Sequence, residues 1–154
     1  MVVCIAIGNS LREDDGVAHH ALRLIAPNDN VRLLQVFQLA PELACEIARA
    51  DLVFFLDADA SAETTMLTPI ETDGAYGGPM AHSMSPAEVV AIASDLYAFA
   101  GKALLCRIPA KQFGFGEELT AAAKAAARSA AKVIVEYVAL HATNPDKLRL
   151  AENC

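Results

Sequence analysis

Short continuous hydrophobic runs alternate along this chain with segments whose apolar residues recur at helical spacing. Continuous runs of strand length are typical of strands that are buried on both faces of a sheet. The runs predict strands at positions 2–7, 31–36, 52–56, 66–71 and 103–108. The run at 52–56, which leads into Asp57, is the most apolar of them. The segments between the runs predict helices at positions 16–25, 41–50, 85–98 and 117–141.

Capping residues and prolines mark several of these helix ends. Ser85, Pro86 and Glu88 fit the N-cap, first and third positions of a helix, so a helix is expected to begin there. Pro41 is expected at the first position of its own helix, and Pro27 follows the helix at 16–25. The glycine-rich segment 74–79 predicts a mobile loop that can fold over a bound partner.

The alternation of strands and helices predicts an α/β fold. We expect a single three-layer domain, with a mostly parallel, twisted sheet of about five strands and helices on both of its faces. The length of 154 residues and the hydrophobic content of 55% suit one domain with a substantial core. This domain is expected to span residues 1–141, and residues 142–154 are expected to form a polar C-terminal tail.

Composition and charge exclude several classes of protein. No apolar run approaches the roughly 20 residues that cross a bilayer, so no membrane association is expected. The net charge of −7 repels phosphate backbones, so nucleic acid is not an expected partner. The first residues lack the basic region and cleavage site of an export signal, which favours the cytoplasm. No heptad pattern or long unpaired strand edge is evident, so a monomer is expected.

The cysteines are scattered without the spacing of metal ligands, and they are Cys4, Cys45, Cys106 and Cys154. This pattern suits a reducing compartment. Cys4 and Cys106 lie inside apolar strand runs, where a cysteine usually acts as a small buried hydrophobe with an inert thiol. Neither is expected to be a nucleophile.

Two aspartates and one histidine are expected where ligands bind in this class of fold. Asp15 closes the loop after the first strand, Asp57 ends the third strand, and His82 lies in the loop that leads into the capped helix. In an open α/β sheet, ligands bind beyond the carboxyl ends of the strands. Two carboxylates and one imidazole form a three-ligand set with open coordination positions, which suits a divalent first-row metal ion.

Structural roles for the same residues remain open from the sequence alone. Asp14 or Asp15 could cap the helix that starts near Gly16. Asp57 could end its strand by accepting hydrogen bonds from loop amides, and a single histidine beside a helix cap is often structural. These residues therefore make a metal site plausible without deciding it.

Other catalytic motifs are absent from the sequence. Gly8 and Gly16 are the only glycines of the first strand–helix turn, which excludes the GxGxxG dinucleotide pattern and the GxxxxGK phosphate loop. The GxSxG elbow of serine hydrolases and the HExxH motif of zinc peptidases are absent too. His19 and His20 are adjacent on a helix, which points their side chains apart, and we expect them to be exposed to solvent.

The segment at positions 7–16, IGNSLREDDG, resembles the N-terminal signature of the hydrogenase maturation protease family. Three further segments follow in the family's order and approximate spacing: QLAPEL at 38–43, LDA at 56–58 and HSMSPAE at 82–88. The segments IPA at 108–110 and GEEL at 116–119, with Phe113 between them, resemble the closing loop before the family's last helix. The resemblance covers about residues 2–140.

This resemblance implies an α/β endopeptidase that removes the C-terminal extension of a nickel–iron hydrogenase large-subunit precursor after nickel insertion. Family members bind nickel through an acidic residue of the first loop, an aspartate that ends a strand, and a histidine. Those positions match Asp15, Asp57 and His82, which are the expected metal ligands and catalytic residues. The family has no serine or cysteine nucleophile, and the nickel is supplied by the substrate. Other divalent metals are expected to bind in vitro.

Two positions depart from the family's pattern. Ala18 stands where many relatives have glycine, a change that tightens one helix–strand contact. Gln35 stands where some relatives have aspartate, so an auxiliary acid there is either missing or replaced, with Asp59 as the candidate replacement.

Two other functions remain as alternatives. A non-catalytic nickel chaperone of the same fold would use the same three ligands without cutting a peptide bond. A flavodoxin-like binder of small molecules is disfavoured by the missing phosphate motifs and by the acidic strand ends. For the protease, Asp57→Ala is expected to abolish processing and to leave the fold nearly intact.

Overall fold

A computed structural model describes residues 1–27, 29–73 and 84–142 of the chain. Within them, the strands form one sheet, and they are β1 (Val2–Ile7), β2 (Val31–Val36), β3 (Leu52–Asp59), β4 (Met66–Pro69) and β5 (Lys102–Pro109). Their order across the sheet is β2-β1-β3-β5-β4. The pairs β1–β2, β1–β3 and β3–β5 are parallel, whereas β4 runs antiparallel to β5. The prediction of a mostly parallel sheet of about five strands is confirmed.

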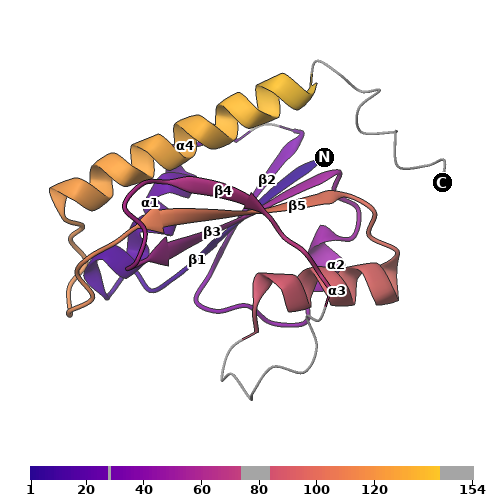
Figure 1. The fold of residues 1–154 in the computed structure, drawn as a ribbon, viewed down its shortest axis with the longest axis horizontal. Helices are drawn as coiled ribbons and strands as arrows, with labels where there is room; N and C mark the ends of the chain where they lie inside the picture. The colour runs from indigo at the N-terminus through magenta and orange to yellow at the C-terminus, as the bar shows by residue number, and fades with distance from the viewer. Residues whose placement is uncertain (28, 74–83, 143–154) are drawn as a thin grey trace.

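Helices cover both faces of this sheet (Figure 1). The short 3-10 helix η1 (Glu13–Gly16) leads into α1 (Val17–Arg23), which packs beside α4 (Ala121–Ala142). The opposite face carries α2 (Leu43–Ile47) and α3 (Pro86–Tyr97), which pack together. The predicted three-layer arrangement is therefore confirmed.

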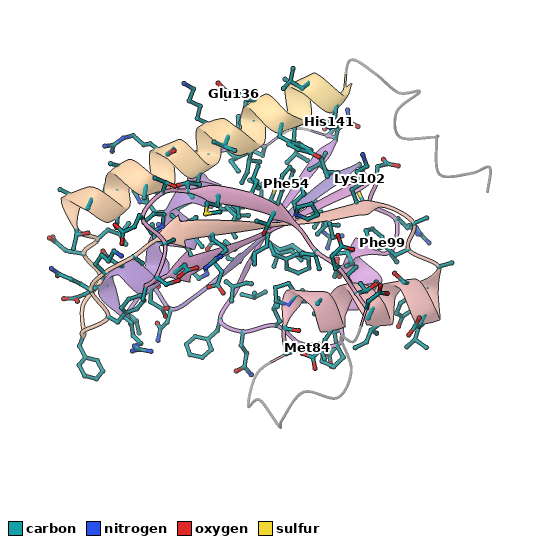
Figure 2. All side chains as sticks on the ribbon, viewed as in Figure 1. Phe54, Met84, Phe99, Lys102, Glu136 and His141 are labelled. Carbon is teal, nitrogen blue, oxygen red and sulfur yellow. The ribbon has the colours of Figure 1, made fainter. Side chains whose placement is uncertain are left out.

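Alternate side chains of the central strands pack into two separate core layers, one on each face of the sheet. Cys4 and Phe54 belong to the apolar cluster with α1 and α4, whereas Ile5 and Phe55 belong to the cluster with α2 and α3. Phe54 is fully buried and makes an edge-to-face contact with Tyr137 of α4, with 5.6 Å between ring centroids. Figure 2 shows Phe54 between the sheet and α4. Burial on both faces explains why these strands read as continuous hydrophobic runs.

The strand predictions agree closely with the structure. Strands β1 and β2 have the predicted bounds, and β3 and β5 extend the predicted strands by one to three residues at their ends. Strand β4 ends at Pro69, two residues before the predicted end at position 71. Proline has no amide hydrogen to donate, which weakens the ladder at that point, although Ile70 still donates to the carbonyl of Ala103 at 3.0 Å.

The helix predictions need three corrections. The helix predicted at 16–25 is α1, which begins at Val17 directly after η1 and ends at Arg23. The helix predicted at 41–50 is reduced to the five residues of α2, so Pro41 lies in the preceding turn. The helix predicted from position 117 begins at Ala121 because the Thr120 hydroxyl accepts the amide hydrogen of Ala123 at 3.1 Å.

The capped helix is confirmed as α3. The Ser85 hydroxyl accepts from the amide of Glu88, and the Glu88 carboxylate accepts from the amide of Ser85, which completes a capping box. The helix ends at Ala98, which adopts a left-handed conformation with φ of 54°.

Some predictions concern residues outside the described ranges. The glycine-rich segment 74–79 and His82 lie there, and so does the predicted tail apart from Ala142, which ends α4. In the part of the chain that the structure describes, no helix is long and apolar enough to cross a membrane.

Candidate functional site

The two candidate aspartates come from neighbouring strands of the sheet. Strands β1 and β3 are parallel and in register, with Ala6 opposite Leu56. The loop after β1 therefore leaves the sheet beside Asp57, at the carboxyl edge where ligands bind in open α/β folds. Asp15 ends that loop, and its negative charge acts on the carboxyl group of Asp57. Asp15 and Asp57 thus lie at the same edge of the sheet, close enough for one charge to act on the other, and their joint role as metal ligands stays a prediction.

Gly8 gives the first loop its shape. Its φ of +144° is rare for residues with a side chain, and a β carbon at this position would lie 2.1 Å from the carbonyl oxygen of Asp15. This close approach lets the amide of Asn9 donate to Oδ2 of Asp15 at 3.0 Å. The amide of Gly8 also donates to the carbonyl of Val36 at the end of β2. Backbone contacts therefore hold the Asp15 carboxylate in place.

The environment of Asp57 favours a bound cation. Burial raises the pKa of Asp57 to about 6, and the charges of Asp15 and Asp59 act in the same direction, while the amide of Ala58 opposes them. Two carboxylates that repel each other in a half-buried place gain stability when a cation lies between them. Asp15 and Asp57 can therefore contribute two oxygen ligands to a divalent metal ion.

Asp59 is held by hydrogen bonds and an ion pair at the end of β3. Its carboxylate accepts from the Ser61 hydroxyl and amide and pairs with the Arg107 guanidinium. Hydrogen bonds from Ser61, together with the charge of Arg107, lower the pKa of Asp59 to about 2 although its partial burial opposes them. Asp59 therefore fixes the turn after β3 and neutralises Arg107, and its role as a replacement for an acid at position 35 stays a prediction.

Asp14 has a structural role that differs from the cap considered for it. Its buried carboxylate accepts from the amides of Lys111, Gln112 and Thr120, at 2.8–3.2 Å, and from the Thr120 hydroxyl at 3.0 Å. The N-cap of α1 is Gly16, and no side chain caps that helix. Asp14 instead joins the loop after β1 to the loop before α4, and sequence reasoning missed this link.

Further contacts join the same two loops. The amide of Gly116 donates to the carbonyl of Leu11 at 3.0 Å, and the amide of Glu13 donates to the carbonyl of Gly116 at 2.8 Å. The Glu13 carboxylate accepts from the amide of Gly114 at 2.9 Å. The segment that carries Asp15 is therefore supported from both sides.

The third predicted ligand, His82, lies outside the described residues. Within residues 1–27, 29–73 and 84–142, no group of three acidic, histidine or cysteine side chains could hold a metal ion. Asp57 follows Phe55 by two positions, so its side chain leaves the sheet on the face that carries α3. Helix α3 begins four residues after His82 in the sequence.

Two cysteines and two histidines outside the predicted ligand set are buried or half-buried. Cys4 and Cys106 are fully buried, and burial raises the pKa of each thiol to about 12, so both stay protonated. The expected exposure of His19 is wrong, because its ring is buried and its Nε2 lies 3.1 Å from the carbonyl of Val36. His20 is half-buried on α1, where burial lowers its pKa and nearby arginine and lysine charges add to the shift.

The fold is shared with several solved structures. The chain is similar to the hydrogenase maturating endopeptidase HybD from E. coli, at 17% identity and a TM-score of 0.70, over 91% of this chain and 93% of that chain. It is similar to the NiFe hydrogenase maturation protease HycI from Thermococcus kodakarensis, at 22% identity and a TM-score of 0.69, over 88% and 90% of the two chains. A hydrogenase 2 maturation peptidase from a Thaumarchaeota archaeon matches at 20% identity and a TM-score of 0.66, over 90% and 98%.

No family model matches the sequence, and no curated protein matches it either. The identities to the solved structures are low, and what they show is a common fold over nearly the whole chain. That fold is the one expected from the resemblance of the segment at 7–16 and the segments that follow it.

Proposed function

We propose that this chain is an endopeptidase of the hydrogenase maturation family, which removes the C-terminal extension of a nickel–iron hydrogenase large-subunit precursor after nickel insertion. The observation that carries the proposal is the meeting of Asp15 and Asp57 at the carboxyl edge of the sheet, in a fold shared with maturation endopeptidases. The sequence segments around both aspartates resemble the same family. The placement of the two aspartates, the sequence segments and the shared fold therefore favour one function.

The proposed role of the two aspartates is to recognise a metal ion that the precursor already holds. Asp15, Asp57 and His82 would add two oxygen ligands and one nitrogen ligand to nickel that cysteines of the precursor bind. Binding through the metal would position the peptide bond to be cut, and positioning alone can contribute several orders of magnitude to a rate. Selectivity for nickel would rest with the precursor, because carboxylates and imidazole also bind copper and zinc.

A processing assay tests this proposal. The purified chain is mixed with a nickel-loaded large-subunit precursor and with the same precursor without metal, and products are separated by mass. Cleavage of the nickel-loaded precursor alone is expected. Retention of uncut precursor together with bound metal would instead support the nickel chaperone.

Substitutions at the site complete the test. Asp57→Asn and His82→Ala are each expected to lower the cleavage rate at least about a hundredfold, because the peptide bond is no longer positioned. Asp29→Asn is the matched control, since Asp29 is exposed on the turn before β2 and its change should leave the rate unaltered. Normal cleavage by the Asp57→Asn variant would contradict metal recognition by this aspartate.

A further inference from the structure

Three exposed hydrophobic side chains lie in loops at the edge of the sheet that carries the candidate site. Leu11, Phe37 and Phe115 retain 58%, 68% and 97% of their accessible surface. They follow the carboxyl ends of β1, β2 and β5, respectively, so all three belong to the edge of the sheet that carries Asp15 and Asp57. We call Leu11, Phe37 and Phe115 the apolar rim.

Hydrogen bonds connect the loops of the apolar rim to the Asp15 loop on both sides. The carbonyl of Val36, the residue before Phe37, accepts from Gly8, and the next amide, that of Asn9, donates to Asp15. On the other side, the amide of Gly116, the residue after Phe115, donates to the carbonyl of Leu11 at 3.0 Å. The loops of the rim are thus continuous with the candidate metal-recognition site.

The loop that presents Phe115 is held by many hydrogen bonds. Asp14 accepts from three amides and a hydroxyl of this loop and the residues after it, and the Arg12 guanidinium donates to the carbonyl of Phe113 at 3.3 Å. A loop with this support can hold an aromatic ring in water without collapsing onto the core. The backbone that carries Phe115 is therefore held in place, and exposed apolar side chains gathered at one edge of a sheet are typical of an interaction site.

We infer that the apolar rim is the docking surface for the body of the metal-loaded precursor, with apolar side chains of that partner around its bound cation. This inference rests on the proposed function. The acidic pair at the same edge is complementary in charge to a metal ion at the partner's surface, and the apolar rim would bury apolar side chains of the partner that lie beside that ion. Aromatic side chains at the centre of an interface commonly supply much of the binding energy.

The triple variant Leu11→Ser, Phe37→Ser and Phe115→Ser tests the inference with the nickel-loaded precursor as the probe. The KM of processing, and the Kd measured with the uncleaved precursor, are expected to rise at least about tenfold. The kcat at saturating precursor is expected to stay within about twofold of wild type, because the rim contributes binding shared by ground state and transition state. Unchanged far-UV circular dichroism and Tm verify that the fold is intact.

Leu96→Ser is the matched control, because Leu96 is 71% exposed on α3 and lies away from the carboxyl edge. A triple variant whose KM and Kd match those of wild type or of Leu96→Ser overturns the inference and leaves the proposed function standing. If wild type neither binds nor cleaves the precursor, the proposed function fails and the inference fails with it.

Sedimentation of the chain without precursor tests whether a second copy of the chain binds to the apolar rim. A wild-type monomer is expected at micromolar concentration. A wild-type dimer that the triple variant dissociates would assign the apolar rim to self-association and overturn docking of the precursor.

Discussion

Asp14 and Asp15 are neighbours in the sequence, yet the fold gives them different chemistry. Both oxygens of Asp14 are occupied by donors from the loop before α4, and the side chain is buried. Burial acts to raise the pKa of Asp14, but hydrogen bonds from Thr120, Lys111 and Gln112 outweigh it and lower the pKa below 3.8. Asp15 accepts a hydrogen bond from one loop amide, and its negative charge acts on Asp57. One aspartate therefore serves stability, and the other is suited to a cation.

Replacing Asp14 should destabilise the fold. In Asp14→Asn, an NH2 group replaces one carboxylate oxygen and cannot accept a hydrogen bond. The backbone N–H groups that donate to that oxygen are partly buried and lose their acceptor. We expect the free energy of unfolding to fall by about 2–4 kcal/mol in urea titrations. Asp29→Asn, at an exposed position, should change it by less than about 0.5 kcal/mol. Equal stability of the two variants would contradict the anchoring role of Asp14.

The same pair of proteins predicts a pH dependence. Because the pKa of Asp14 is lowered on folding, its ionised form stabilises the folded state. The stability advantage of wild type over Asp14→Asn is therefore complete well above pH 3.8 and declines as the pH falls below that value. Urea titrations of both proteins at neutral pH and at pH near 3 measure it. A stability difference between wild type and Asp14→Asn that grows as the pH falls would contradict stabilisation by the ionised form of Asp14.

At the residue scale, sequence reasoning found the acids but could not divide their roles. Asp57 was identified because it ends an apolar run, a local signal. The residues that donate to Asp14 lie about a hundred positions away in the sequence, and no local pattern around Asp14 predicts them. Thr120, three positions before Ala123, is the local cap signal that would have moved the start of α4 to its observed place.

At the scale of elements, strands were easier to predict than helices. Strand β1 is buried along its middle and appears as an uninterrupted apolar run, whereas the edge strand β2 is partly exposed; both have the predicted bounds. Helix α2 is limited to Leu43–Ile47, with turns at 41–42 and 48–49, and the apolar spacing of 41–50 marks neither end.

The loop after β1 predicts a contrast between two glycine substitutions. In Gly8→Ala, the new methyl group would meet the Asp15 backbone at 2.1 Å in an unfavourable φ region, so we expect a loss of at least about 2 kcal/mol in the free energy of unfolding. In Gly114→Ala, the nearest atom is Oε2 of Glu13 at 2.9 Å, at the end of a flexible side chain that can move. A loss below about 1 kcal/mol is expected there, with urea titration as the measurement.

Activity should separate the two glycine variants as well. Gly8→Ala displaces the Asp15 carboxylate and is expected to impair precursor processing, whereas Gly114→Ala should retain it. Equal loss of processing in both would show that the Asp15 position does not depend on the close approach at Gly8.

For the whole molecule, one sheet serves two core layers, so the layers are expected to unfold together. Phe54 and Phe55 are adjacent and fully buried, but they face α4 and α3, respectively. Phe54→Leu and Phe55→Leu should each lower the free energy of unfolding by about 1–3 kcal/mol, with a single transition in circular dichroism. Phe115→Leu makes the same change at an exposed ring and should have an effect below about 0.5 kcal/mol. A separate second transition in either core variant would indicate independent layers.

The bonds between the loop after β1 and the loop before α4 also set an order for biosynthesis. Asp14 and Thr120 are 106 positions apart in the sequence. In a growing chain that has emerged only as far as β5, the loop that contains Asp14 and Asp15 therefore lacks the hydrogen bonds that hold it. The emerging protein would reach its competent state only when its last quarter is free to fold. Shortened translation products, even those with both candidate carboxylates, should therefore be unable to recognise a precursor ahead of the finished molecule.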